Sequence, residues 1–165
     1  MSLPVPPAYQ AWVRETIEAT RAMANGDDVP VAALVADETG RVIARGQNER
    51  EQRKDPTAHA EILALRRAAG VRGTWNLTGC TLVVSLEPCP MCAGALASAR
   101  ISSVVFGAWD DKAGAAGSVC DLLRDRRFPH RAEVYGGVLE EECMEVLTEF
   151  FRRHRVDPQG RAHRS

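Results

Sequence analysis

The stretch TLVVSLEPCPMCAGALASA, residues 81–99, decides the fold. Its apolar start, Thr81 to Ser85, predicts a short buried strand. Pro88 to Ala99 then predicts a short helix that begins directly after the strand. Cys89 and Cys92 lie in the first turn of that helix, where residues at i and i+3 share a face. The segment therefore predicts a strand, a tight turn and a helix whose opening end presents two sulfur atoms.

The rest of the chain alternates between the same two kinds of element. Apolar residues at helical spacing predict a helix over Tyr9 to Asn25, with Gly26 as its stop. Strands over Val29 to Ala36 and Arg41 to Arg45 flank a turn at 37–40. The other expected elements are helices over 57–69, 118–124 and 140–153 and strands over 103–106 and 132–135. This order predicts an α/β domain with helices on both faces of its central strands.

Composition places the chain among folded soluble proteins. It has 165 residues, of which 45% are hydrophobic and 26% charged, which is enough for one domain with a core. We expect a single domain over 1–165, with an ordered core over about 8–155 and a basic tail over 156–165. There is no run of about 18 apolar residues, and residues 1–10 lack a secretory pattern. We therefore expect a cytoplasmic protein without a membrane span.

The cysteines and the charge narrow the possible functions. Five cysteines are an odd number, which argues against a disulfide framework and for metal binding or buried thiols. Cys80, Cys120 and Cys143 carry no motif, and we expect them to be buried thiols. The net charge of −1 means that a polyanion would need a local basic patch. The segment from Arg152 to Ser165 is one candidate, and a solvated chain end is the alternative.

A second segment, Pro56-Thr57-Ala58-His59-Ala60-Glu61, supplies a nitrogen ligand. His59, Cys89 and Cys92 together provide one nitrogen and two sulfurs, which suit three protein ligands of a tetrahedral zinc ion. No further histidine or cysteine stands at a convincing spacing, so the fourth position is left for water, as in catalytic zinc sites. A redox Cys-x-x-Cys pair is the alternative, and it leaves His59 and Glu61 unexplained.

Glu61 follows His59 by two residues, so both side chains reach one metal only if it lies off the opening end of their helix. That helix is expected over 57–69, with Pro56 near its first turn and Gly70 as its stop. Zinc lowers the pKa of bound water to near neutrality, and a carboxylate beside it can move protons to a leaving group. Glu61 is therefore a candidate proton shuttle. A structural histidine and a surface glutamate are the alternative.

The two segments resemble the zinc signature of the cytidine/adenosine deaminase superfamily. From about Trp12 to Arg155 the chain is similar to the branch that deaminates adenosine in bacterial tRNA, with residues 106–118 and 150–152 selecting that branch. The resemblance implies a three-layer α/β/α cytidine-deaminase-like domain with a mixed five-stranded sheet. It also implies one Zn²⁺ per chain, bound by His59, Cys89 and Cys92, with Glu61 as the catalytic residue.

The resemblance further implies a reaction and partners. The expected reaction converts the wobble adenosine, position 34, of an arginine tRNA to inosine and releases ammonia. A tRNA loop suits such chemistry because its unpaired bases cost little to splay out. The expected partners are the tRNA anticodon stem-loop and a second copy of the chain in a homodimer. The residues implied to contact substrate are Asn48, Ala60, Asp110, Lys112, Phe151 and Arg152.

Several of these residues also have ordinary structural interpretations. Asn48 can end a strand or form a turn. Lys112 and Arg152 can be plain surface charges. Phe151 is interpreted as a core residue, with packing on an unstacked base as the alternative. Trp109 departs from the family pattern, and stacking of its indole on a loop base is one hypothesis for its role.

Two other functions remain open from the residues alone. A small-molecule nucleobase deaminase, such as a guanine deaminase, has nearly the same zinc motifs but does not need the block from Lys112 to Ser118. A zinc-stabilised RNA-binding module without catalysis would have no use for Glu61 beside an open metal position. The interpretation as a catalytic tRNA deaminase accounts both for the block from Lys112 to Ser118 and for Glu61.

Overall fold

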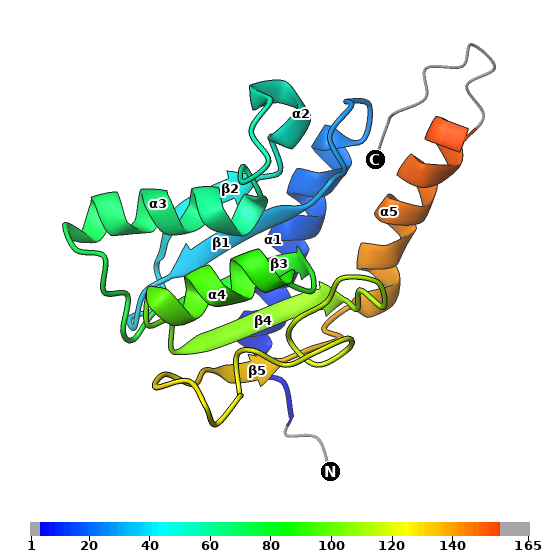
Figure 1. Ribbon diagram of the computed structural model, residues 1–165. Helices are drawn as coiled ribbons and strands as arrows, with labels where there is room; N and C mark the ends of the chain where they lie inside the picture. The colour runs from blue at the N-terminus through cyan, green and yellow to red at the C-terminus, as the bar shows by residue number, and fades with distance from the viewer. Residues whose placement is uncertain (1–3, 156–165) are drawn as a thin grey trace.

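The computed structural model describes residues 4–155, and the basic tail expected over 156–165 lies outside the described residues. A central sheet carries α3 and α4 on one face and α1 and α5 on the other (Figure 1). This arrangement confirms the expected three-layer α/β/α domain. Within the described part of the chain, no helix is long and apolar enough to cross a membrane.

The sheet has five strands in the order β2-β1-β3-β4-β5. β1 pairs antiparallel with β2 and β3, whereas β3, β4 and β5 are parallel, so the sheet is mixed as expected. The strands are β1 (Ala32–Ala36), β2 (Val42–Gln47), β3 (Thr81–Leu86), β4 (Ser103–Ala108) and β5 (Glu133–Tyr135). The helices are α1 (Pro7–Met23), α2 (Arg50–Arg53), α3 (Ala60–Arg72), α4 (Pro90–Ser98) and α5 (Glu140–Arg155).

The centre of the sheet positions the site. The central strands β1, β3 and β4 are buried almost throughout, because helices cover both of their faces. Leu86, the last residue of β3, pairs with Ala108, the last residue of β4. Since parallel strands end at the same edge, the segments that follow them, beginning at Glu87 and Trp109, lie side by side. That edge is where α4 begins.

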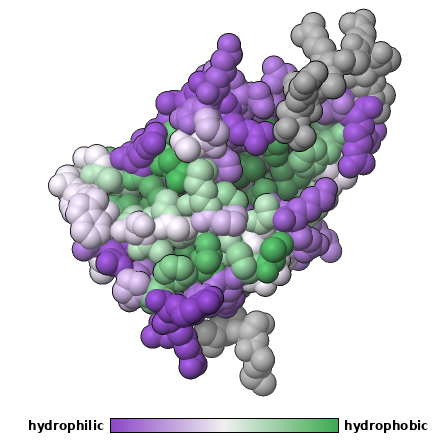
Figure 2. All heavy atoms as spheres, viewed as in Figure 1, coloured by the Kyte–Doolittle hydropathy of each residue, from purple (hydrophilic) through white to green (hydrophobic). Residues whose placement is uncertain are grey.

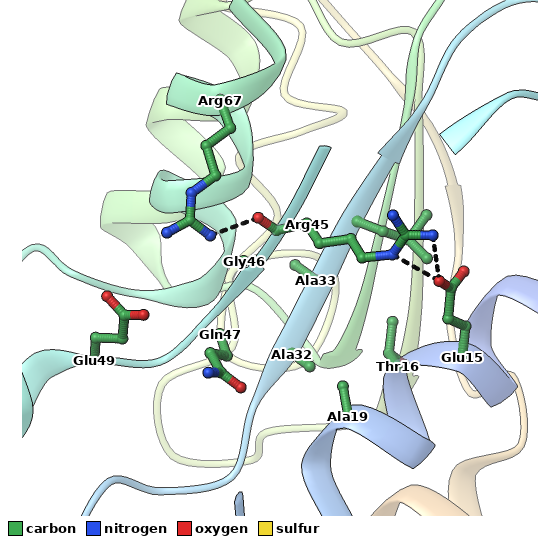
Figure 3. Close-up of a pocket in the computed structure, with 11 residues that line it drawn as sticks. Glu15, Thr16, Ala19, Ala32, Ala33, Arg45, Gly46, Gln47, Glu49 and Arg67 are labelled. Atoms are coloured by element: carbon green, nitrogen blue, oxygen red, sulfur yellow. Dashed lines mark hydrogen bonds and ion pairs between the residues drawn. The ribbon is translucent and has the colours of Figure 1, made fainter. Parts of the chain in front are cut away.

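A close approach holds α3 on β2. Gly46 faces the start of α3, where a Cβ atom would lie 2.4 Å from the Ala60 carbonyl oxygen. Nearby, Arg67 of α3 donates to the Arg45 carbonyl oxygen over 2.7 Å, while the Arg45 guanidinium pairs with Glu15 of α1 (Figure 3). These groups surround a cavity of about 240 Å³. β2 is thereby fixed to α1 and α3.

Two local expectations were wrong. The helix expected over 118–124 is instead a set of turns closed by a bridge between Ala116 and Asp121. Gly117, at φ 139°, breaks any helical path there. The helix expected over 57–69 instead spans Ala60–Arg72, because His59 is its N-cap residue and its stop is Gly73 at φ 67°, not Gly70.

One short helix was missed by sequence reasoning. α2 is a single turn that ends at Lys54 in the left-handed region, with φ 51°. Its first backbone N–H groups, from Glu51 and Gln52, donate to the Asp28 carboxylate at 2.6 and 3.2 Å. A contact between residues so far apart in sequence fixes this turn, and no local pattern indicates it.

Candidate active site

The two predicted zinc segments meet at the opening ends of two helices. His59 is the N-cap residue of α3, and Cys89 is the N-cap residue of α4, with Cys92 in the first turn of α4. His59 Nδ1 lies 3.6 Å from Cys89 Sγ and 3.5 Å from Cys92 Sγ. The three ligand atoms all lie within 4.8 Å of one another. Both helices thus direct the positive ends of their dipoles at this cluster.

The cluster fits a zinc ion. Tetrahedral Zn²⁺ with Zn–N near 2.0–2.1 Å and Zn–S near 2.3 Å requires N···S separations of about 3.6 Å. The two observed separations of 3.5 and 3.6 Å match that requirement without rearrangement. Among residues 4–155, the group of possible ligands has these three members, which leaves a fourth coordination position for water or substrate.

The thiols are prepared for a cation. A hydrogen bond from the Cys92 thiol lowers the pKa of Cys89 to about 4, and His59 adds to that effect. The same hydrogen bond, together with burial, raises the pKa of Cys92. Its hydrogen bond with Cys89 raises the pKa of His59. These contacts favour the thiolate form at Cys89, and a bound cation favours it at Cys92 as well.

Glu61 lies beside this cluster as the second residue of α3 and is only 4% exposed. Burial raises its pKa to about 7, although its own backbone N–H and nearby His59 act in the opposite direction. It is not a member of the ligand group. A carboxyl group that titrates near neutrality can both accept and return a proton, which suits general acid–base catalysis.

A pocket of about 190 Å³ opens over the cluster. Apolar side chains of Val29, Val31 and Leu86 form part of its wall. Six of the residues singled out from the sequence line it, namely Asn48, His59, Ala60, Glu61, Cys89 and Asp110. Cys92 is fully buried, behind the pocket. Besides Cys92, the predicted residues outside the lining are Lys112, Phe151 and Arg152.

Asn48 and Asp110 also organise the backbone around the pocket. The Asn48 amide donates to the Val29 carbonyl oxygen at 3.1 Å and accepts the Arg50 N–H at 3.2 Å. The Asp110 carboxylate accepts the N–H groups of Lys112 and Ala113 at 3.0 and 3.1 Å. Both residues therefore combine a position in the pocket wall with a structural role in a turn.

The C-terminal helix corrects one expectation. Phe151 is not the core residue that we expected: its side chain is 45% exposed, and the neighbouring Phe150 occupies the core position instead. Arg152 is exposed and forms a bidentate pair with Glu149. Arg153 donates to Asn25 at 2.7 Å. Both arginines therefore have partners within the protein, and Glu149 offsets the positive charge of Arg152.

Trp109 is held by its neighbours. Its ring meets the Phe106 ring edge to face, with centroids 4.8 Å apart. Cβ atoms on Gly117 and Gly136 would lie 3.2 and 2.8 Å from the indole, so the ring packs directly against both glycines. Only part of the ring is open to solvent, so stacking on an RNA base stays a prediction.

The three cysteines outside the motif differ from one another. Cys80 and Cys143 are buried, as predicted, and burial raises the pKa of each thiol. Cys120 is exposed, so the prediction that it is buried was wrong. The turns that replace the helix expected over 118–124 leave this side chain outside the core.

Of the pocket residues that escaped the sequence reasoning, two are charged. Arg50 lies in α2 at the pocket, and nothing in its local pattern indicates this position. Glu87 lines the pocket and is only 2% exposed. The sequence did contain a signal for Glu87, because it is a charged residue directly after a buried strand. Such a residue is rarely buried without partners.

Comparison with known proteins agrees with this chemistry. A profile of the MafB19-like deaminase family matches residues 8–155. The chain is 45% identical over 146 residues to the tRNA-specific adenosine deaminase of Bacillus subtilis, and the match covers 88% of this chain and 90% of the relative.

Solved structures give the same picture. A structure from work on A-to-I editing by tRNA:A34 deaminases at the wobble position of transfer RNA matches with a TM-score of 0.78 and 38% identity, over 83% of this chain and 99% of the other. A guanine deaminase from Nitrosomonas europaea matches with a TM-score of 0.75 and 27% identity, over 91% and 95% of the two chains. The chemistry of the site and these matches together assign the chain to the family of tRNA-specific adenosine deaminases.

Proposed function

We propose that the protein converts adenosine 34 of a tRNA, in particular an arginine tRNA, to inosine and releases ammonia. The observation that carries the proposal is the buried Glu61 carboxyl beside three zinc-type ligands in one pocket. The similarity to the Bacillus subtilis enzyme supports tRNA as the substrate. Residues 106–118 and 150–152 support the tRNA branch of the family, and the choice of an arginine tRNA rests on the family resemblance as a whole.

The residues of the pocket have separate roles in the reaction, namely metal binding and proton transfer. His59, Cys89 and Cys92 would hold a Zn²⁺ ion, which would supply the Lewis acidity that makes water a nucleophile near neutral pH. Glu61 accepts a proton from the attacking water and passes it to N1 of adenine, as the water oxygen bonds to C6 and the C6–N1 double bond opens. Glu61 then takes the remaining hydroxyl proton and delivers it to the exocyclic nitrogen, as the bond from C6 to that nitrogen breaks, the C6 carbonyl forms and ammonia leaves. Water is consumed, and the adenine ring becomes hypoxanthine.

The pocket walls hold the purine while the proton moves. Val29, Val31 and Leu86 offer apolar surface to the ring, and burial of the base excludes bulk water from Glu61. Asn48 presents its amide at the same pocket, where it can accept or donate a hydrogen bond to the nucleoside. A cavity of about 190 Å³ suits a single flipped base.

The RNA backbone is proposed to lie across basic residues around the pocket. Arg50 lies at the pocket and is exposed, and Lys112 follows the pocket residue Asp110 by two positions. Arg152 is exposed at the end of α5, beside Phe151, whose open ring is available to stack on a base. These residues are expected to add affinity through phosphate contacts.

We also propose that the protein acts as a homodimer. Hydrophobic side chains gather over α4 in the middle of the face shown in Figure 2. Trp75 is 64% exposed and Phe128 46% exposed, and both line a hollow of about 440 Å³ with Ala93 and Ala97 of α4. Apolar surface of this kind is typical of a protein contact. A second copy of the chain is the proposed occupant of this hollow.

The proposed location of the protein is the cytoplasm, where free thiols such as those of this chain persist.

One assay tests the substrate. The purified protein is incubated with an arginine tRNA carrying adenosine 34, the same tRNA carrying guanosine 34, free adenosine, cytidine and guanine, and inosine and ammonia are measured. Inosine formed only from the first tRNA is the expected result. Ammonia released from guanine, with no reaction of the tRNA, would replace the proposal by a guanine deaminase activity.

A further inference from the structure

Glu87 is a buried carboxylate that the deamination chemistry does not use. It follows β3 directly and is 2% exposed. Oε1 accepts the backbone N–H groups of Ala116 and Ser118 at 3.1 and 3.0 Å. Oε2 accepts the N–H of Asp110 at 2.9 Å and lies 2.6 Å from the Ser118 hydroxyl. All four contacts come from one loop, which we define as the 109–118 loop.

The charge of Glu87 is stabilised by this loop. Within residues 4–155, none of the ion pairs includes Glu87. Backbone and hydroxyl dipoles therefore offset the charge in place of a cation. A buried carboxylate with four satisfied contacts strongly fixes the groups that donate to it.

The sequence makes space for this arrangement at one glycine. A Cβ atom on Gly114 would lie 2.2 Å from Glu87 Oε2 and 2.2 Å from Ser118 Oγ. A second contact ties the loop to the metal segment, because the Ala115 N–H donates to the Pro88 carbonyl oxygen over 2.8 Å. The loop is therefore seated directly against the turn that carries Cys89.

The 109–118 loop forms one wall of the active-site pocket. Asp110 and Ala113 line the pocket together with residues of α3, and Lys112 lies between them in the chain. Ser118 Oγ is also 2.7 Å from the Asp110 carbonyl oxygen, so the two ends of the loop are closed on each other at Glu87. The buried Glu87 carboxylate thus determines the position of this wall.

We propose that Glu87 is a positioning residue that holds the 109–118 loop as the substrate-binding wall of the pocket. It acts through Asp110 and Ala113 and takes no part in proton transfer. The substrate in this proposal is the one under the proposed function, but the control of the loop by Glu87 is independent of it. Glu87 should therefore affect how well the RNA binds more than how fast the bound adenosine reacts.

Glu87→Gln tests this directly. Whichever way the new amide is turned, its NH₂ group faces a backbone N–H of the loop, of Asp110 or of Ala116 and Ser118. KM for an anticodon stem-loop with adenosine 34 should rise about ten- to hundredfold, while kcat changes by less than about threefold. Zinc should stay at one ion per chain. The control is Glu141→Gln, at an exposed position in the first turn of α5, which should change neither constant.

Gly114→Ala disturbs the same contact while leaving Glu87 in place. It should raise KM in the same way, and the double variant should show less than the product of the two single effects. Gly70→Ala is the matched control, because nothing lies within 4 Å of a Cβ atom there. This second variant keeps the proposal testable if Glu87→Gln does not fold.

Hydrogen exchange gives a readout that does not depend on the substrate. In Glu87→Gln, the amides of 109–118 should exchange at least about tenfold faster, and those of α3 should be unchanged. If wild-type protein leaves the stem-loop unreacted, the proposed function fails and exchange alone decides the role of Glu87. Unchanged exchange in the loop, or a fall in kcat at constant KM, would overturn the positioning role.

Discussion

A Cβ atom on Gly46 would lie 2.4 Å from the carbonyl oxygen of Ala60, so β2 and the start of α3 touch backbone to backbone. The Ala64 N–H nitrogen would be 2.7 Å from the same atom. Because α3 begins with the zinc-type ligand His59 and with Glu61, this contact sets the position of half the site. Gly46, which takes no part in the reaction, therefore helps to determine where His59 and Glu61 lie.

Gly46→Ala should for this reason reduce both stability and metal binding. Overpacking at a backbone contact is expected to lower the free energy of unfolding by about 1–3 kcal/mol. Gly70→Ala, on the open side of α3, should instead raise it by about 0.5–1 kcal/mol, because alanine is the better helix former. Urea unfolding of both variants with zinc analysis measures the pair. Equal stability of the two variants would contradict the close contact.

Zinc should be bound at about one ion per chain, and its removal should expose specific thiols. With zinc bound, iodoacetamide is expected to modify Cys120, which is exposed, and to spare the buried Cys80 and Cys143. Chelation should add Cys89, whose low pKa makes it the more reactive thiolate of its pair. Peptide mass spectrometry measures the pattern. Labelling of Cys89 that is unaffected by chelation would contradict the assigned ligand set.

The arginines at the end of α5 should contribute affinity without contributing to chemistry. Replacing Arg152 and Arg153 by alanine should weaken tRNA binding and lower the slope of log K against log salt by up to about 0.7–0.9 for each phosphate that is no longer bound. The single-turnover rate at saturating enzyme should stay constant. Arg41→Ala, in the turn between β1 and β2 at the other end of the sheet, is the control. A salt slope equal to that of wild type would exclude this helix end from the RNA site.

The apolar hollow beside α4 should control assembly. Trp75→Glu and Phe128→Glu place a charge in exposed apolar surface and are expected to convert a dimer to a monomer. Met144→Glu, on the exposed side of α5, is the matched control. Sedimentation velocity of the three variants measures the mass. Dimers that persist in both hollow variants would place the contact elsewhere.

The layers of the fold and the group of metal ligands with Glu61 were predictable, because the sequence patterns that indicate them are local. Cys89 and Cys92 lie at the opening end of a helix that follows a strand, as the sequence predicts. The helix that carries Glu61 was also predicted, although its start was placed three residues too early, at 57. The α5 stripe at Cys143, Leu147 and Phe150 has i, i+4, i+7 spacing, which identifies Phe150 as the core residue and Phe151 as the exposed one. The exposure of Phe151 was therefore also predictable from the sequence.

The remaining features depend on contacts between distant residues. α2 exists because Asp28 accepts its first N–H groups. The segment over 118–124 is not helical because Glu87, about thirty positions earlier, binds the backbone of Ala116 and Ser118. Neither contact leaves a periodic pattern in the chain, so propensity alone favoured a helix in the second case and no structure in the first.

The central claim is that Glu61 moves the protons of the reaction without binding the metal. Glu61→Gln keeps the size of the side chain and its capacity for hydrogen bonds, but it cannot accept a proton from water. Zinc content and tRNA affinity should therefore stay close to those of wild type. Glu61→Ala, which also removes the hydrogen bonds, serves as the companion variant.

The deciding measurement is the single-turnover rate of inosine formation by zinc-loaded Glu61→Gln on a tRNA with adenosine 34. General acid–base catalysis contributes about 10²–10⁴-fold, and one residue serves both transfers here, so the loss should be at or above the top of that range. A zinc-loaded variant that forms inosine within about tenfold of the wild-type rate would contradict the account.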